Sequence, residues 1–257
     1  MDDIVTLYNK AEEEGTAPLP EYLKAAFAPV AFEAVGYPTR VTSDLELWRF
    51  ADVMQDGRWG ETMDALGGLR PREQDLVEHI QIMVHKLTTE MGRGVTPTDA
   101  LLRAVMVYRW IKEHYPCGQV HEFGPGSGYV GALLLADGHY LYSSTEVTQA
   151  FALWQMILHT AIGRERNHYM PWWTWIRSGV RNKAHVITAN HMLNEMHPEA
   201  LSFILVRSQM CLDRQGAFVV EEIGSEVLRP CQGTLDALKK SGLPVHISRA
   251  QGPFERL

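Results

Sequence analysis

The sequence predicts an α/β protein with a mainly parallel sheet, preceded by a domain of helices. Residues 1–115 space their apolar side chains as helices do and contain no strand-like alternation. From residue 116 onward, short apolar segments alternate with helical patterns, which is typical of a parallel sheet covered on both faces. The 257 residues are enough for both parts.

The helical part contains two well-marked helices. Residues 72–92 carry apolar side chains on one face and charges on the other, and Gly92 ends the pattern. Residues 96–99 combine capping side chains with a proline, so they predict the start of a second helix that ends near residue 115. We expect residues 1–115 to form a lid, a substrate wall or a dimer contact.

The second part predicts a regular series of elements. The expected strands are residues 118–123, 139–144, 185–189, 217–221 and 244–248, and the expected helices are 148–161, 198–216 and 233–241. Residues 167–175 interrupt the series, since they predict a loop followed by a short helix that begins near Pro171. Little chain remains after residue 248 for a further strand.

Composition excludes several classes of function. The 24 basic and 31 acidic residues give a net charge of −7, which argues against a nucleic-acid partner. No apolar run reaches the roughly 18 residues of a membrane span, and residues 1–4 lack the basic start of a signal peptide, so we expect neither. Cys117, Cys211 and Cys231 are far apart, so we expect no disulfide framework and a reducing cytoplasm. No metal-binding motif occurs, and we expect no metal.

A glycine-rich segment follows the first expected strand. Gly124, Gly126 and Gly128 allow the backbone to approach a ligand closely, and the helix after them offers free N–H groups. Gly126, Gly128 and Gly131 also satisfy the dinucleotide pattern G-x-G-x-x-G, so an NAD-dependent oxidoreductase is an alternative.

Two acids help to choose the ligand. Glu122 lies two residues before the first glycine, where its charge disfavours a pyrophosphate but suits a ligand with an ammonium and a sulfonium group. Glu146 ends the next expected strand, where a carboxylate accepts both ribose hydroxyls of either ligand. Because Glu146 suits both ligands, Glu122 is the residue that favours SAM over NAD.

Residues 120–128 and Glu146 resemble the first motif and the ribose-binding acid of the class I S-adenosylmethionine (SAM)-dependent methyltransferases. The resemblance covers roughly residues 116–250 and implies a Rossmann-like, seven-stranded sheet in a SAM-binding domain, residues 116–257. It also implies that Gly124, Gly126 and Gly128 line the methionyl part of SAM.

A narrower resemblance lies further along the chain. Residues 189–196 and 216–221 resemble the fourth and fifth motifs of sugar O-methyltransferases, with His191 where a small residue is expected. This resemblance implies a small-molecule acceptor, and methylation of nitrogen or carbon stays open.

Most of the candidate catalytic residues lie at the end of the expected strand that Asn190 terminates. His191 is the first candidate general base, with Glu195 to orient its ring, and His168 is the second. Glu195 is alternatively a structural cap or a substrate ligand. Asn190 is expected to bind the SAM amino group or the substrate.

Further candidates belong to the substrate side. Trp172 and Trp173 either wall the substrate or pack between the insertion and the N-terminal helices. Glu221 and Glu222 end a strand, and one of them, with Glu222 preferred, is expected to point into the cleft. The leading hypothesis is an O-methyltransferase, and a homodimer is one assembly that it allows. A SAM-binding protein without catalysis is a further alternative.

Overall fold

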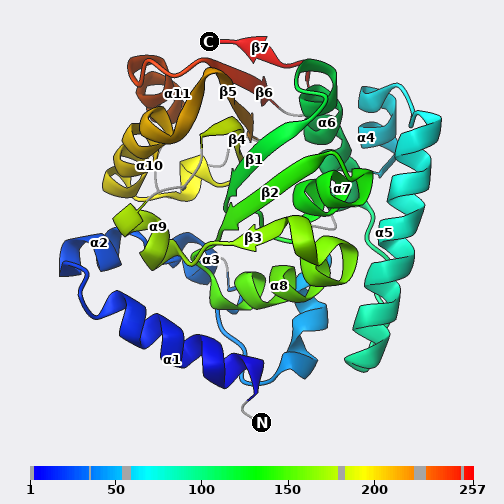
Figure 1. Ribbon diagram of the computed structural model, residues 1–257, viewed down its shortest axis with the longest axis horizontal. Helices are drawn as coiled ribbons and strands as arrows, with labels where there is room; N and C mark the ends of the chain where they lie inside the picture. Colours follow the sequence, from blue (N-terminus) through cyan, green and yellow to red (C-terminus); the bar gives the residue numbers. More distant parts are fainter. Residues whose placement is uncertain (1–2, 35, 54–58, 179–182, 223–229, 250–251) are drawn as a thin grey trace.

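The computed structural model describes residues 3–34, 36–53, 59–178, 183–222, 230–249 and 252–257, in which seven strands form one sheet (Figure 1). The strand order is β3-β2-β1-β4-β5-β6-β7, with the first six strands parallel and β7 antiparallel to β6. The strands are β1 (Gly118–Phe123), β2 (Tyr140–Thr145), β3 (Asn167–Tyr169), β4 (Ala184–Asn190), β5 (Leu212–Glu222), β6 (Val245–Arg249) and β7 (Glu255–Arg256). The order reverses between β1 and β4, where ligands bind in open parallel sheets.

Helices cover both faces of the sheet (Figure 1). One face carries α6 (Asp99–His114), α7 (Tyr129–Asp137) and α8 (Gln149–Gly163), which pack side by side. The other face carries α9 (Trp172–Ser178), α10 (Pro198–Cys211) and α11 (Cys231–Lys240). Because crossovers between parallel strands are right-handed, the reversal of strand order sends the later helices to the second face.

The first half of the chain wraps around this core. Its elements are α1 (Ile4–Thr16), α2 (Glu21–Ala26), α3 (Val30–Ala34), the 3₁₀ helix η1 (Asp44–Phe50), α4 (Trp59–Leu66) and α5 (Pro71–Glu90). Helix α1 contacts α8 and α9, and α5 packs against α7 and α8. The Tyr129 hydroxyl donates a hydrogen bond to the backbone carbonyl of Ala51, which joins the start of α7 to the end of η1.

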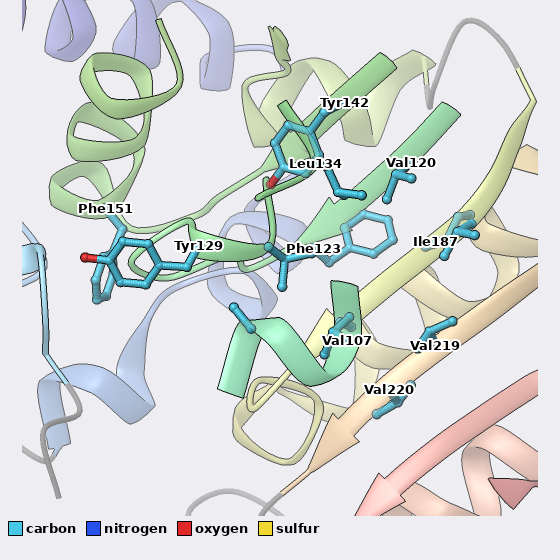
Figure 2. Packing of buried hydrophobic residues seen from close by; sticks show 14 of the residues in the cluster. Val107, Val120, Phe123, Tyr129, Leu134, Tyr142, Phe151, Ile187, Val219 and Val220 are labelled. Carbon is cyan, nitrogen blue, oxygen red and sulfur yellow. The ribbon is translucent and has the colours of Figure 1, made fainter. Parts of the chain in front are cut away.

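Part of the hydrophobic core lies between α7 and the central strands (Figure 2), and the core continues on the other face of the sheet through α9 and α10. Tyr142 of β2 is 1% exposed and Leu134 of α7 is fully buried. A Cβ atom added to Gly131 would lie 2.4 Å from Cζ of Tyr142, so only glycine lets α7 approach β2 this closely. This approach sets the height of the glycine segment above the sheet.

The fold class predicted from the sequence is confirmed, with two local corrections. Residues 167–169, expected as a loop, form β3, because three polar residues pair with β2 at the edge of the sheet. The strand expected at 217–221 begins five residues earlier, at Leu212, after a register shift between Ala184 and Val186 of β4. The short helix expected near Pro171 is α9.

Candidate active site

The glycine segment forms a tight turn between β1 and α7. Gly124, Gly126 and Gly128 have φ angles of 55°, 53° and 80°, a region that favours glycine. The Gly128 N–H donates to the Pro125 carbonyl at 2.8 Å and closes the turn. A Cβ added to Gly126 would meet no atom within 4 Å, so the backbone here faces open space. The turn leaves room for a ligand directly above it.

Glu122 lies beneath this turn and is 2% exposed. The Tyr142 hydroxyl donates to its Oε2 at 2.6 Å, and Asn190 Nδ2 donates to its Oε1 at 3.1 Å. Burial raises the pKa of Glu122 to about 7, although both hydrogen bonds oppose the shift. The carboxylate is therefore held in place but lacks a cationic partner among the described residues, and a cationic ligand would favour its charged form.

Glu146 follows β2 on the other side of the turn and is 4% exposed. Its Oε1 accepts from the Thr148 N–H at 3.0 Å and its Oε2 from the Gly126 N–H at 3.3 Å. Burial raises the pKa of Glu146, and these backbone N–H groups lower it in part. The carboxylate thus has a fixed position at the rim of the glycine turn.

Asn190 ends β4 and connects three strands. Besides its bond to Glu122, its Oδ1 accepts from the Glu221 N–H at 3.2 Å and from the Thr188 hydroxyl at 3.2 Å. The side chain therefore positions the Glu122 carboxylate at the point where the strand order reverses.

His191 follows Asn190 and has a φ of 55°, the one non-glycine residue with positive φ in the described chain. Its N–H donates to the Glu221 carbonyl at 2.8 Å, and its ring Nε2 lies against Glu221 Oε2 as an ion pair when the ring is protonated. The Glu221 side chain is 1% exposed and the His191 side chain is 22% exposed. A carboxylate in contact with an imidazole nitrogen fixes the orientation of the ring.

Glu195 lies near the same histidine but does not stand on a helix that begins at His191. It ends the 3₁₀ helix η3 (Leu193–Glu195), which starts two residues after His191. Burial raises the pKa of Glu195, and the charge of His191 opposes that shift. The contact partner of the His191 ring is Glu221, so the expected orienting role of Glu195 falls to a residue of the neighbouring strand.

These groups line one pocket. Its floor consists of the glycine turn, Glu122, Glu146, Asn190, His191 and Glu221, and Glu195, Met192 and Met196 lie at the His191 end. The opposite wall comes from the first half of the chain, through Ala28, Pro29, Ala31, Phe32 and Val53, and from α6, through Ala100, Arg103, Ala104 and Val107. The pocket therefore combines a polar floor with a mostly apolar cover.

Three candidates expected from the sequence lie apart from this pocket. His168 is exposed on the edge strand β3. Trp172 and Trp173 are 7% and 4% exposed and pack against α1 and α2, with Trp173 5.6 Å from the Tyr8 ring and Trp172 stacked 6.0 Å from Phe27. The backbone of Glu222 ends β5, but its side chain lies outside the described residues.

Sequence reasoning did not place Glu221 beside His191, nor Arg103 and Phe32 in the pocket wall. Two adjacent acids at a strand end leave the inward one undetermined until the register is known. Arg103 is 7% exposed and lies on α6 one turn after the buried Asp99, and a charged residue that is this buried is uncommon.

Two further properties concern metals and membranes. Within the described residues, no three His, Cys, Asp or Glu side chains are arranged to hold a metal ion. None of the described helices has both the length and the apolar character that a membrane crossing needs.

Comparison with known proteins gives structural matches alone. No protein-family model and no curated protein matches the chain. Several of the solved structures that it resembles are methyltransferases. The mitomycin 7-O-methyltransferase MmcR is 16% identical, with 91% of this chain and 74% of that chain covered and a TM-score of 0.46.

Two other structures contain a cofactor or an analogue of it. The magnesium protoporphyrin IX methyltransferase ChlM from Synechocystis PCC 6803, with bound S-adenosylhomocysteine (SAH), is 13% identical, covers 61% of this chain and 80% of that chain, and has a TM-score of 0.43. The glycopeptide N-methyltransferase MtfA, complexed with sinefungin, is 14% identical, covers 48% of this chain and 49% of that chain, and has a TM-score of 0.40. The chain thus spans about half the length of MtfA.

Proposed function

We propose that this protein is a SAM-dependent methyltransferase that acts on a small molecule. The observation that carries the proposal is the placement of two buried carboxylates, Glu122 and Glu146, on either side of a glycine turn that faces open space. Glu122 suits the ammonium group of SAM, and Glu146 suits the two ribose hydroxyls. SAM, when bound, supplies a methyl group made electrophilic by its sulfonium.

The same carboxylates argue against NAD. A pyrophosphate above the glycine turn would face Glu122, which is buried and has no cationic partner in the described chain. Like charges in a buried site repel strongly because little solvent screens them. An NAD-dependent oxidoreductase is therefore the less favoured alternative, and titration with NAD tests it.

We further propose that the acceptor atom is a hydroxyl oxygen and that His191 removes its proton. His191 lies at the carboxyl end of β4, within the pocket, and Glu221 contacts its ring. A neutral imidazole accepts the proton as the hydroxyl attacks, and the Glu221 carboxylate stabilises the imidazolium that results. Alignment of the acceptor hydroxyl with the methyl group of SAM inside the pocket supplies the rest of the rate enhancement.

The proposal extends to the parts of the chain around the site. Residues 1–115 would act as lid and substrate wall, and residues 116–257 as the cofactor domain. Support comes from the pocket wall, which the first half supplies through residues such as Phe32 and Arg103. The free cysteines and the acidic charge fit a cytoplasmic enzyme, active as a monomer or a homodimer, without a nucleic-acid partner.

Calorimetric titration of the full chain with SAM and, separately, with NAD tests the cofactor. We expect SAM to bind with micromolar affinity and NAD not to bind. Release of SAH in the presence of a panel of hydroxylated and aminated small molecules then tests catalysis. Binding of NAD instead of SAM would overturn the proposal, and SAM binding without turnover on any acceptor would favour a regulatory SAM-binding protein.

A further inference from the structure

The His191 end of the pocket contains carboxylate oxygens that have no part in the proposed reaction. Among the described residues that line the pocket, four are glutamates and one, Arg103, is an arginine. Glu122 and Glu146 face the glycine turn, and Glu221 contacts His191 through its Oε2, which leaves Glu195 and the Oε1 of Glu221 for the acceptor. Arg103 lines the α6 wall and has interactions of its own.

Glu221 provides the observation that points to a ligand. The side chain is 1% exposed, and only its Oε2 contacts His191. Among the described residues, neither carboxylate oxygen of Glu221 and neither ring nitrogen of His191 has a hydrogen-bond partner, and the Oε1 of Glu221 lacks even the ion-pair contact that Oε2 makes. A buried carboxylate oxygen without a hydrogen-bond donor destabilises the folded protein. A donor on a bound molecule would offset this desolvation penalty.

Glu195 supports the same conclusion independently. It lines the pocket from η3, and none of the ion pairs among the described residues includes its carboxylate. Only the charge of His191 acts on Glu195 to lower its pKa. Its pKa is raised because burial penalises the charged form. A cation placed beside it would remove that penalty.

We propose that the acceptor carries a protonated amine, which binds between the Glu195 carboxylate and the free Oε1 of Glu221, while its hydroxyl faces His191. This inference rests on the proposed function for the hydroxyl and for the cofactor, but it concerns a separate part of the molecule. An ammonium has three donors and no acceptor, so it satisfies both carboxylates and leaves one donor for a backbone carbonyl or water. The apolar wall around Phe32 and Met196 would hold the carbon skeleton.

Two matched sets of probes test the inference. The first is tyramine, 4-ethylphenol and 4-hydroxyphenylacetate, and the second is glucosamine, glucose and glucuronate. In the first set the phenol is kept and its para substituent changes from cationic to neutral to anionic. In the second set the pyranose ring is kept, with an amine at C2 in glucosamine and a carboxylate at C6 in glucuronate. Binding of each probe is measured by calorimetry on the full chain saturated with SAH, and then by SAH release with SAM.

We expect the amine of at least one set to bind about tenfold more tightly than its neutral partner, and the anion to bind least. Glu195→Gln should abolish that tenfold preference and leave the affinity for the neutral probe unchanged. Glu78→Gln, which removes an exposed carboxylate of α5 with the same change of charge, should keep the preference.

The outcomes separate this inference from the proposed function. SAH binding together with a preference for the neutral or anionic probes, or with no binding of any amine, overturns the amine site and leaves the methyltransferase proposal intact. A preference for amines that depends on Glu195, in a protein that binds neither SAM nor SAH, supports the amine site and overturns the methyltransferase proposal.

Discussion

Asn190 Nδ2 donates a hydrogen bond to Glu122 Oε1 at 3.1 Å and so joins the ends of β4 and β1. The bond lies where the strand order reverses, directly below the glycine turn. It fixes the direction of a carboxylate whose pKa, at about 7, lies close to physiological pH. The charge of Glu122 is therefore poised to respond to a bound cation.

Binding of SAM should release a proton from Glu122. Because burial holds the pKa near 7 in the free protein, the carboxyl is mostly protonated at pH 6 and mostly ionised at pH 8. The affinity for SAM should rise about tenfold between these values. Calorimetry in buffers of different ionisation enthalpy measures the released proton. Glu122→Gln should lose both the proton release and the pH dependence; an unchanged dependence in this variant would assign it to another group.

The same carboxyl should affect the stability of the ligand-free protein. The folded pKa of about 7 lies above the ordinary glutamate value of 4.5, so the native state binds protons more tightly between these two pH values. The free energy of unfolding should therefore fall as pH rises from 4.5 to 7, by roughly 2–3 kcal/mol from this group. Urea denaturation at pH 5 and pH 8 measures the fall. The fall in the free energy of unfolding should be smaller in Glu122→Gln. A fall of equal size in this variant would show that a group other than Glu122 causes it.

Glu146→Ala should weaken SAM binding roughly 100-fold, because two ribose hydroxyls lose a charged acceptor. The variant also removes the acceptor for the Gly126 N–H, which belongs to the glycine turn. Calorimetry gives the affinity, and circular dichroism checks that the fold is retained. Glu78→Gln serves as the control. Wild-type affinity in Glu146→Ala would mean that the ribose lies elsewhere.

His191→Asn should lower kcat by 10²–10⁴-fold, the usual contribution of a general base, while the affinity for SAM stays within about twofold. Asparagine tolerates the positive φ of this position, so the backbone should keep its path. Release of SAH with an acceptor that the wild type methylates gives the rate. A variant that keeps its kcat would exclude His191 as the base.

Trp173→Ala should destabilise the fold and leave the acceptor site unchanged. The ring is 4% exposed and meets the Tyr8 ring edge-on at 5.6 Å, so its loss should cost about 3–5 kcal/mol. Thermal unfolding gives the stability, and the KM for the acceptor is measured below the new melting temperature. A raised KM with unchanged stability would instead support a substrate wall.

Local patterns in the sequence were enough for most of the sheet and for the glycine turn. β1, the glycines and the acid after β2 follow one another within 29 residues, and each is marked by its own residues. β3 escaped prediction because Asn167–Tyr169 has neither length nor an apolar face, and pairing with β2 alone defines it. The beginning of β5 escaped for a similar reason, since Asp213, Arg214 and Gln215 are polar.

The acceptor side of the pocket depends on contacts between distant residues. The proximity of His191 and Glu221 follows from the register of β4 against β5, which periodicity does not reveal. Phe32 and Val53 reach the pocket from more than 60 residues before the glycine turn. No local pattern marks such residues, because their role comes from where the chain folds back.

This separation has a use in enzyme engineering. The glycine turn and most of the apolar pocket lining belong to different stretches of the chain, and that lining consists largely of small or flexible side chains such as Ala28, Ala31, Ala100 and Met196. A combinatorial library confined to these positions would reshape the pocket and leave Glu122 and Glu146 unchanged. The scaffold thus offers new acceptor selectivity by directed evolution, with SAM affinity as a constant against which each variant can be screened.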